Sequence, residues 1–229
     1  MTEKIKIVTL LKSGPAWLPE YVYRLHRAVS RHLDVPHEFV CLTDIELGVR
    51  TLPLIPMPEI DDTDCQVNIP KFWYKVQLFR PELELTSGCI FLDLDTIIKG
   101  NIDHYVDVFR EHDFLMAASP YRGNISCSYF MWWQGDHSSI WNQFLKKPVT
   151  EWNQHYHKAN PGKYGDQGFI SDHVTHGLIQ AVMNDSTTDI VRVTKNSSRG
   201  DDAARIIVFA GKRKPWDMPW HADVQDHWL

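Results

Sequence analysis

Apolar and polar residues along the first 42 positions follow a strand, helix, strand pattern. Residues 5–11 form a short apolar run that ends in Lys-Ser-Gly-Pro, which is typical of a strand followed by a loop. Apolar residues then recur at helical spacing, so residues 18–34 are expected to form an amphipathic helix. A second apolar run at 38–42 completes a βαβ unit, which predicts parallel strands joined by a right-handed crossover.

The rest of the chain also mixes strand and helix patterns, and it contains no internal repeat. Residues 43–69 show no period and are expected to form a loop broken by a short strand near 51–55. A helix is expected to begin near Pro70 and to end before Pro81. The remaining patterns predict a helix or turn at 101–110, strands at 113–118 and 127–133, helices at 137–146 and 167–176, and a final strand at 205–210.

Length and charge fit one enzyme domain. A chain of 229 residues can form a single α/β unit with a sizeable core, and no composition shift marks a domain boundary. We therefore expect one α/β domain over 1–229, with a mostly parallel central sheet flanked by helices. The formal net charge is −5 and no run of Lys or Arg forms a stripe, so a nucleic-acid partner is not expected.

The four cysteines and the apolar runs bear on where the protein works. The cysteines are scattered without Cys-x-x-Cys spacing, which argues against zinc and redox motifs. Cys41 and Cys89 lie inside apolar runs, where a free thiol behaves as a small apolar side chain. Free thiols of this kind indicate a reducing compartment. No stretch approaches the ~20 apolar residues that a membrane span requires. We therefore expect a soluble, cytoplasmic protein; the oligomeric state is not predicted.

The most informative pattern is an apolar run, 88–92, that ends in two carboxylates separated by one leucine. In an extended chain Asp93 and Asp95 point to the same side while Leu94 points to the other, toward a core. In open α/β sheets, ligands bind outside the carboxyl ends of the strands. Two carboxylates there suit Mg²⁺ or Mn²⁺, completed by phosphate oxygens and water. The alternative is a pair of acids that only begin a turn.

This metal hypothesis makes a structural demand. Both carboxylates must face an open cleft, and neighbouring bases must not already neutralise them. If either condition fails, the function inferred from this motif loses its basis.

Several segments, in order along the chain, resemble nucleotide-sugar glycosyltransferases of GT-A fold. The resemblance is to glycosyltransferase family 8 and to its looser bacterial and phage relatives. The segment that carries most of the resemblance is the strand that ends in Asp93-Leu94-Asp95. The others are the strands at 5–11 and 39–44, the Lys-bearing helix at 71–79, the Gly-Asp-Gln at 165–167 and the Phe-Ala-Gly-Lys-Arg-Lys-Pro-Trp at 209–216.

The resemblance implies an activity and a set of site residues. It implies transfer of a sugar from a nucleoside diphosphate sugar, expected to be UDP-linked, to a saccharide or glycosylated acceptor, with Mn²⁺ or Mg²⁺ and with retention of anomeric configuration. The implied metal ligands are Asp93 and Asp95, and the implied catalytic residues are Asp166 and Gln167. The implied donor-binding residues are Thr9, Leu10, Leu11, Asp44, Lys75, Asp93, Lys195, Gly211 and Lys214.

Two of these residues have ordinary structural alternatives, and one expected ligand is missing. Lys75 could lie on a solvated helix face, and Asp166 could serve as the N-cap of the helix at 167–176. Family 8 enzymes usually supply a third metal ligand from a His just before the aromatic residue of the last motif, and some relatives supply it just after. Here those positions hold Val208 and Ala210. The site would then rest on two acids alone, or take His221 or His227 from the tail.

Two other functions remain open on sequence grounds. The missing His is compatible with a nucleotide-sugar or glycan-binding protein that has lost turnover. A phosphatase of the haloacid dehalogenase type would use Asp93 as nucleophile, together with Lys195 and Gly200-Asp201-Asp202. That superfamily typically opens with its Asp-x-Asp motif, whereas here the motif lies behind a complete βαβ unit.

Overall fold

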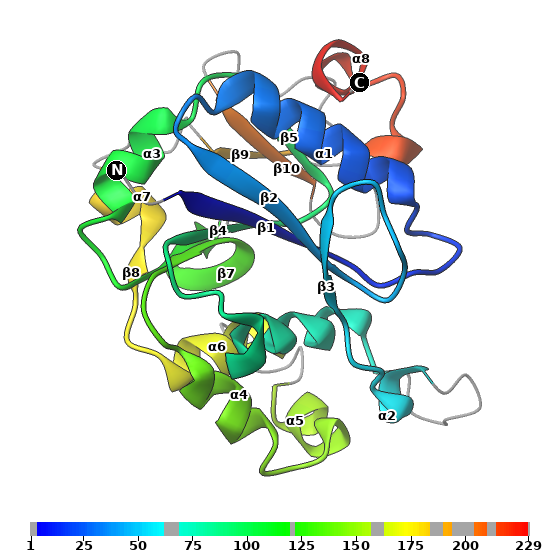
Figure 1. Ribbon diagram of the computed structural model, residues 1–229, viewed down its shortest axis with the longest axis vertical. Coiled ribbons are helices and arrows are strands. Elements are labelled where there is room, and N and C mark those ends of the chain that lie inside the picture. The colour runs from blue at the N-terminus through cyan, green and yellow to red at the C-terminus, as the bar shows by residue number, and fades with distance from the viewer. Residues whose placement is uncertain are drawn as a thin grey trace.

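A central sheet runs through the molecule, and helices cover both of its faces (Figure 1). The structure is a computed structural model that describes residues 4–61, 69–119, 122–156, 163–183, 190–193, 204–209 and 214–228. Within these ranges the strands of the central sheet are β1 (Ile5–Leu11), β2 (His37–Thr43), β3 (Arg50–Pro53), β4 (Cys89–Leu92), β6 (Phe114–Ser119), β7 (Arg122–Trp133) and β8 (Gly177–Leu178). A smaller sheet holds β5 (Thr96–Ile98), β9 (Ile190–Val193) and β10 (Ile206–Phe209).

The strand order places β1, the first strand of the βαβ unit, between β2 and β4. The described strands follow the order β3-β2-β1-β4-β7-β6-β8. β1 is parallel to both β2 and β4, β2 is parallel to β3, and β6 is parallel to β8. β7 is antiparallel to β4 and β6, so among the described strands of this sheet it alone runs against the others. The prediction of an α/β fold with a mostly parallel sheet is confirmed.

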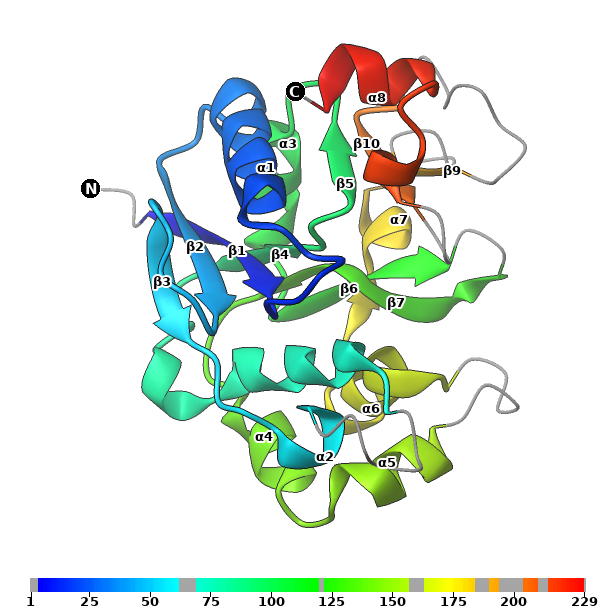
Figure 2. The same ribbon diagram turned by 90° about the vertical axis from the view of Figure 1, so that its right-hand side faces the viewer.

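Helices form a layer on each face of the sheet. The α-helices are α1 (Pro19–His32), α2 (Pro58–Asp61), α3 (Asp103–Phe109), α4 (Ser138–Phe144), α5 (Val149–His155), α6 (Gly165–His173), α7 (Ile179–Val182) and α8 (Ala222–His227). The 3₁₀ helices are η1 (Lys71–Phe79), η2 (Pro81–Leu83) and η3 (Pro215–Asp217). Figure 2 shows α1, α3 and the smaller sheet on one side, and α4, α5 and α6 on the other.

Strand alternation in β1 explains why the molecule has two cores. Ile5, Ile7 and Leu11 point to the side of α1 and the smaller sheet, and all three are buried there. Val8 and Leu10 point to the opposite side, where they pack in the cluster that includes residues of η1, α4 and α6. Each fully buried aliphatic side chain of this kind contributes roughly 1.5–3 kcal/mol. Burial on both faces favours the near-continuous apolar run seen in the sequence.

The predicted helix after Pro70 forms, but it is a 3₁₀ helix. A 3₁₀ helix has three residues per turn, so Trp73, Val76 and Phe79 share one face, and all three are buried. Arg80, which precedes a proline, takes an extended conformation with ψ of 127°, as the proline ring requires. η1 therefore ends where the sequence predicted.

The acid pair lies in a turn and not on an extended strand, which corrects the expected backbone conformation. β4 ends at Leu92, and the amide of Thr96 donates to the carbonyl of Asp93 at 3.1 Å, closing a tight turn. The amide of Asp93 donates to the carbonyl of Tyr129 in β7 at 3.0 Å. Leu94 is buried, as expected. The turn, anchored by β7, sets the directions of the two carboxylates.

Asp166 is not the N-cap of the helix that follows it, which was its alternative structural role. α6 begins at Gly165, and its N-cap residue is Tyr164. Asp166 therefore lies in the first helical turn and is not the N-cap. A carboxylate at this position interacts favourably with the positive end of the helix dipole.

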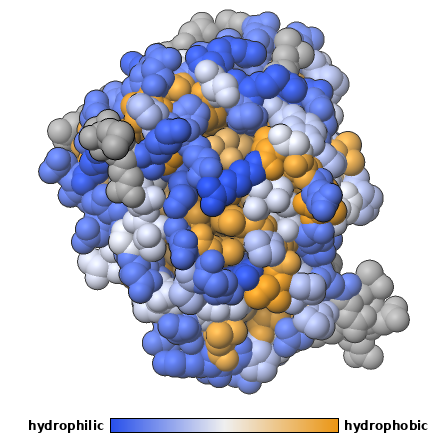
Figure 3. Space-filling model, in the orientation of Figure 1, coloured by the Kyte–Doolittle hydropathy of each residue, from blue (hydrophilic) through white to orange (hydrophobic). Residues whose placement is uncertain are grey.

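Most of the face seen in Figure 1 carries hydrophilic residues, with apolar patches near its middle (Figure 3). The large apolar side chains that are most exposed among the described residues are Leu18, Ile55, Leu145 and Trp220. No helix in the described ranges is both long enough and apolar enough to cross a bilayer.

Gly165, where α6 begins, has a backbone that requires glycine. Its φ is +61°, in the left-handed region, and a Cβ there would overlap the ring of Phe72. Gly135 also has a positive φ, +80°, but no described atom lies within 4 Å of the position that a Cβ would take. A substitution at Gly135 therefore tests backbone strain alone, whereas the same substitution at Gly165 adds steric overlap.

We expect Gly135→Ala to lower the free energy of unfolding by about 1 kcal/mol, from backbone strain alone. Gly165→Ala should cost at least ~2 kcal/mol more, because overpacking adds to the strain. Urea denaturation followed by circular dichroism measures both. Adding Phe72→Ala to Gly165→Ala should reduce the extra loss. Equal losses in the two single variants would show that the Phe72 contact is unimportant.

Candidate functional site

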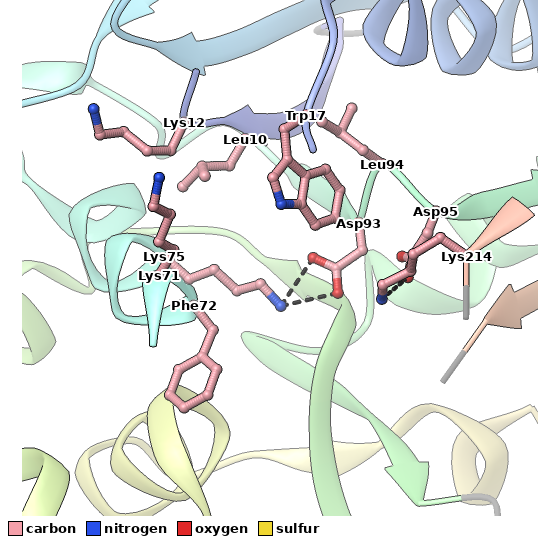
Figure 4. A pocket seen from close by; sticks show the side chains of 10 residues that line it. All are labelled: Leu10, Lys12, Trp17, Lys71, Phe72, Lys75, Asp93, Leu94, Asp95 and Lys214. Carbon is pink, nitrogen blue, oxygen red and sulfur yellow. Dashed lines mark hydrogen bonds and ion pairs between the residues drawn. The ribbon is translucent and has the colours of Figure 1, made fainter. Parts of the chain in front are cut away.

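A cavity of about 330 Å³ opens at the carboxyl ends of β1 and β4 (Figure 4). Its apolar walls come from Leu10 at the end of β1, Trp17 in the following loop, Phe72 of η1 and Leu94 of the acid turn. Its polar lining consists of two carboxylates and four lysines. Ligands of α/β sheets bind at this edge, and a cavity of this size suits a small-molecule ligand.

Asp93 and Asp95 both line the cavity, which meets the first demand of the metal hypothesis. The second demand is not met, because each carboxylate already contacts a lysine, so the acid pair by itself no longer supports the metal site or the function inferred from it. Lys75 Nζ lies 2.8 Å from Asp93 Oδ1 and 3.0 Å from Oδ2. Lys214 Nζ lies 2.5 Å from Asp95 Oδ2. Figure 4 shows the two ion pairs side by side.

Lys75 is the more deeply held of the two lysines. Its ammonium group also lies 3.2 Å from Ser128 Oγ and 3.7 Å from Asp166 Oδ2, and 11% of the side chain is exposed. Burial by itself lowers the pKa of Lys75, but Asp93 and Asp166 outweigh it, so the pKa is raised. Lys75 is therefore a fixed positive charge, and the alternative of a solvated helix face is wrong.

Asp93 holds its negative charge at an energetic cost. Burial raises the pKa of Asp93 to about 6, and Asp95 and Asp166 add to the rise while Lys75 opposes it. A carboxylate whose ionised form is disfavoured by its surroundings gains from any cation that reaches it. Such perturbed groups in a cavity are typical of functional sites.

Two lysines of the cavity were not predicted from sequence. Lys12 follows β1 and contacts Asp44 at 2.6 Å and Asp61 at 3.6 Å. Lys71 lies at the start of η1 and makes no hydrogen bond or ion pair with any described residue. The sequence did hold a signal for each. Lys12 directly follows the first predicted strand, and Lys71 lies four positions before Lys75. Four lysines and two acids line the cavity. Two of these lysines also contact acids that do not line it: Lys12 contacts Asp44 and Asp61, and Lys75 contacts Asp166.

Of the residues expected to bind the donor near the first two strands, Leu10 lines the cavity. Thr9 is fully buried, and its hydroxyl donates to the carbonyl of Leu92 at 2.8 Å, which ties β1 to β4. Leu11 is buried in the core on the α1 side. Asp44 accepts hydrogen bonds from the amide and hydroxyl of Ser13, both at 2.8 Å, so both of its oxygens are engaged.

Asp166 joins the polar group at the base of Lys75. Ser128 Oγ donates to Asp166 Oδ2 at 2.6 Å, and the Asp166 side chain is 7% exposed. Gln167 follows it in α6 and is partly buried. The structure thus brings Asp166, Lys75 and Asp93 together from three segments distant in sequence. Lys195 and Gly211 lie outside the described residues.

A metal ion would find two carboxylates here and no third protein ligand. Val208 of β10 pairs in register with Thr96, the residue after Asp95. The position where relatives carry a His ligand therefore lies beside the acid pair, but here it holds a buried, apolar side chain. His221 is fully buried and lies 3.7 Å from Asp223, and no group of three metal-ligating residues forms among the described residues. Borrowing His221 or His227 as a third ligand is therefore wrong for this arrangement. Ala210 lies outside the described ranges.

Sequence comparison finds a glycosyltransferase relative. No family model matches the chain. Mouse glycogenin-1 is 25% identical over 169 residues, which is 64% of this chain and 46% of glycogenin-1. The chain therefore spans about half the length of the curated relative that it matches.

Solved structures of glycosyltransferases share the fold. The galactosyltransferase LgtC, solved with donor and acceptor sugar analogues, aligns over 97% of this chain and 96% of its own, with a TM-score of 0.57 and 10% identity. GlyE of Streptococcus pneumoniae aligns over 99% of this chain and 61% of its own, with a TM-score of 0.53 and 14% identity. Mouse xyloside xylosyltransferase 1 aligns over 90% and 97%, with a TM-score of 0.51 and 12% identity. The resemblance to family 8 and to the GT-A fold is confirmed.

Lys75→Met should destabilise the protein by about 3 kcal/mol, because it leaves the buried Asp166 and the partly exposed Asp93 without their cation. Adding Asp93→Asn should restore part of this loss, since the amide carries no charge. Lys71→Met is the matched control and should change stability by less than about 0.5 kcal/mol. Urea denaturation of the four proteins tests this. A double variant no more stable than Lys75→Met would contradict the assigned pair.

Proposed function

We propose that this chain is a single glycosyltransferase domain that moves a sugar from a nucleoside diphosphate sugar, expected to be UDP-linked, to a saccharide or glycosylated acceptor. The observation that carries the proposal is the cavity at the ends of β1 and β4, where two carboxylates and four lysines meet. Glycosyltransferases are the proteins that this chain resembles in sequence and in fold. A diphosphate ester is an anionic ligand that this lining fits.

The charges of the cavity suit a departing diphosphate. Negative charge develops on that group as the bond to the sugar breaks, and fixed cations placed around it lower the barrier. Lys75 is held in place by Asp93 and Ser128, so it needs no reorganisation. Lys214 lines the same cavity. Lys195 and Gly211 stay in the proposal on the resemblance alone.

Asp93 and Asp95 are the residues that would hold Mg²⁺ or Mn²⁺. Magnesium is commonly bound by one or two carboxylates, with phosphate oxygens and water completing its shell. The two acids are of the right type for this pattern, but each would first have to release the lysine that it contacts. When bound, the cation supplies Lewis-acid stabilisation of the diphosphate. The similarity to glycosyltransferases supports metal assistance, and the proposal covers either Mg²⁺ or Mn²⁺.

The proposed reaction retains the anomeric configuration. The bond between the anomeric carbon and the diphosphate oxygen breaks, and a bond to the acceptor hydroxyl oxygen forms on the same face. The hydroxyl proton passes to an oxygen of the departing diphosphate. Asp166 and Gln167 would lie against the sugar and the acceptor, and the hydrogen bond from Ser128 would hold Asp166 in position.

The cysteines support a reducing compartment. Cys41, Cys89 and Cys127 are free thiols, and the first two are buried. Burial raises the pKa of both buried thiols to about 12, so they stay protonated and unreactive at neutral pH. We extend the proposal to a cytoplasmic location on this ground.

A nucleotide-sugar binding protein without turnover is the second candidate. The apolar Val208 at the position of a third ligand favours it, because a weaker metal site stabilises the leaving group less. Calorimetry with UDP and Mn²⁺, run beside donor hydrolysis, separates the two candidates. Binding without any hydrolysis across donors and acceptors would support the second.

Slow hydrolysis of one nucleotide sugar is expected in the presence of Mn²⁺, even without acceptor. Asp95→Ala should lower this rate at least ~10²-fold, the scale of losing one preorganised electrostatic group. Asp107→Ala is the matched control, because Asp107 is exposed on α3, and it should change the rate less than about twofold. A thermal-shift screen of nucleotide sugars with Mn²⁺ selects the donor first. Equal rates in wild type and Asp95→Ala would refute the assigned site.

The anomeric configuration of the product tests the proposed course of the reaction. Proton NMR of the first product formed from a UDP-α-sugar should show the α-linked sugar. The reading must be taken before spontaneous mutarotation when water is the acceptor. A β-linked first product would mean inversion, with attack from the face opposite the diphosphate.

A further inference from the structure

We infer that Lys214 is an exchangeable counter-ion of Asp95, so that the acid pair accepts a divalent cation only together with a nucleoside diphosphate. The inference rests on the proposed function and deepens it. It concerns the order in which ligands fill the cavity, and it assigns Lys214 two alternative partners: the Asp95 carboxylate and the diphosphate.

The two ion pairs leave little attraction for a bare cation. Asp93, Asp95 and Asp166 carry three negative charges, and Lys75 and Lys214 carry two positive charges within contact distance of them. The group therefore has a net charge of −1 when all five are ionised. A divalent cation added alone would bring this group to +1 beside the further positive charge of Lys71, which lines the same cavity, and such an excess of one sign is unfavourable. A diphosphate that arrives with the cation restores the balance.

The contacts identify which lysine can move. Lys75 is held by both oxygens of Asp93, by Ser128 and by Asp166, so its position is fixed from several sides. Lys214 Nζ contacts Asp95 Oδ2 and lies 5.8 Å from the ring centroid of Trp17, with 22% of its side chain exposed. An ammonium on a flexible four-carbon stem can turn from one oxygen ligand to another at small cost.

The side chain of Lys214 has space in the cavity to leave Asp95. Lys214 is the N-cap residue of η3, and its amide donates to Asp217 at 3.1 Å, so the backbone is anchored while the side chain extends into the cavity. Trp17, Asp95 and Lys214 line the same space. A diphosphate in that space would offer Lys214 new oxygen ligands and release Asp95 for the cation.

Exchange of this kind predicts a reciprocal coupling. If UDP raises the affinity for Mn²⁺ by some factor, Mn²⁺ must raise the affinity for UDP by the same factor. We expect a factor of at least ~10 in wild type, which corresponds to about 1.4 kcal/mol. The expected effect comes from two sources: the diphosphate supplies ligands to the cation, and it removes Lys214 from Asp95.

The experiment is isothermal titration calorimetry of MnCl₂ with and without saturating UDP, on wild type, Lys214→Met and Lys71→Met. Lys214→Met should bind Mn²⁺ alone roughly tenfold more tightly than wild type, because Asp95 is left without its cation, and should bind UDP more weakly. Lys71→Met removes an equal charge from the same cavity without freeing an acid. It should leave the affinity for Mn²⁺ alone within about twofold of wild type.

The opposite signs in Lys214→Met are the diagnostic result, since a purely structural defect would weaken both ligands. Lys214→Gln, with the same expected signs, serves if the Met variant does not fold. Unchanged Mn²⁺ affinity in the Lys214 variants, or wild-type Mn²⁺ affinity independent of UDP, would overturn the inference. Hydrolysis of the selected donor is measured in parallel: if it persists, the counter-ion inference fails alone; if neither UDP nor Mn²⁺ binds, the proposed function fails with it.

Discussion

Two aspartates that line one cavity require positive charge beside them, and the rest of the site follows from that requirement. Burial raises the pKa of Asp93, and Lys75 is the group that keeps the carboxylate ionised near neutral pH. Lys214, from the far end of the chain, forms an ion pair with Asp95. Each of the two acids is therefore paired with a lysine before any ligand enters.

The fold supplies the positions that this balance needs. β1 and β4 are parallel neighbours, so the loop after β1 and the acid turn after β4 meet at one edge of the sheet. The antiparallel β7 brings Ser128 and the carbonyl of Tyr129 to the same edge, where they hold Lys75 and the Asp93 amide. η1 presents Lys75 from the opposite helical layer. The part of the site around Lys75 is therefore fixed by main-chain pairing and by packing.

Much of the architecture could be predicted because burial leaves a periodic signature. The apolar runs at 5–11 and 38–42 and the helical spacing at 18–34 each correspond to an observed element. The acid pair was recognisable because charge at the end of a buried run is costly unless it has a use. Two details escaped: the Asp93–Asp95 segment is a turn, and Asp166 lies inside the helical turn that begins at Gly165. Local hydrogen bonds and backbone dihedral angles decide such details, and residue types specify them weakly.

The sequence by itself determined the mostly parallel α/β sheet, the acid pair at a strand end and the missing third ligand at Val208. Each follows from residue types and their spacing, which act locally. Only the tertiary structure decided that Lys75 and Lys214 neutralise those acids, that Lys12, Lys71 and Trp17 share the cavity, and that Thr9 and Asp44 are occupied by other partners. Those contacts join segments up to 119 positions apart. Coulomb interactions depend on distance in space, which the order of residues along the chain does not contain.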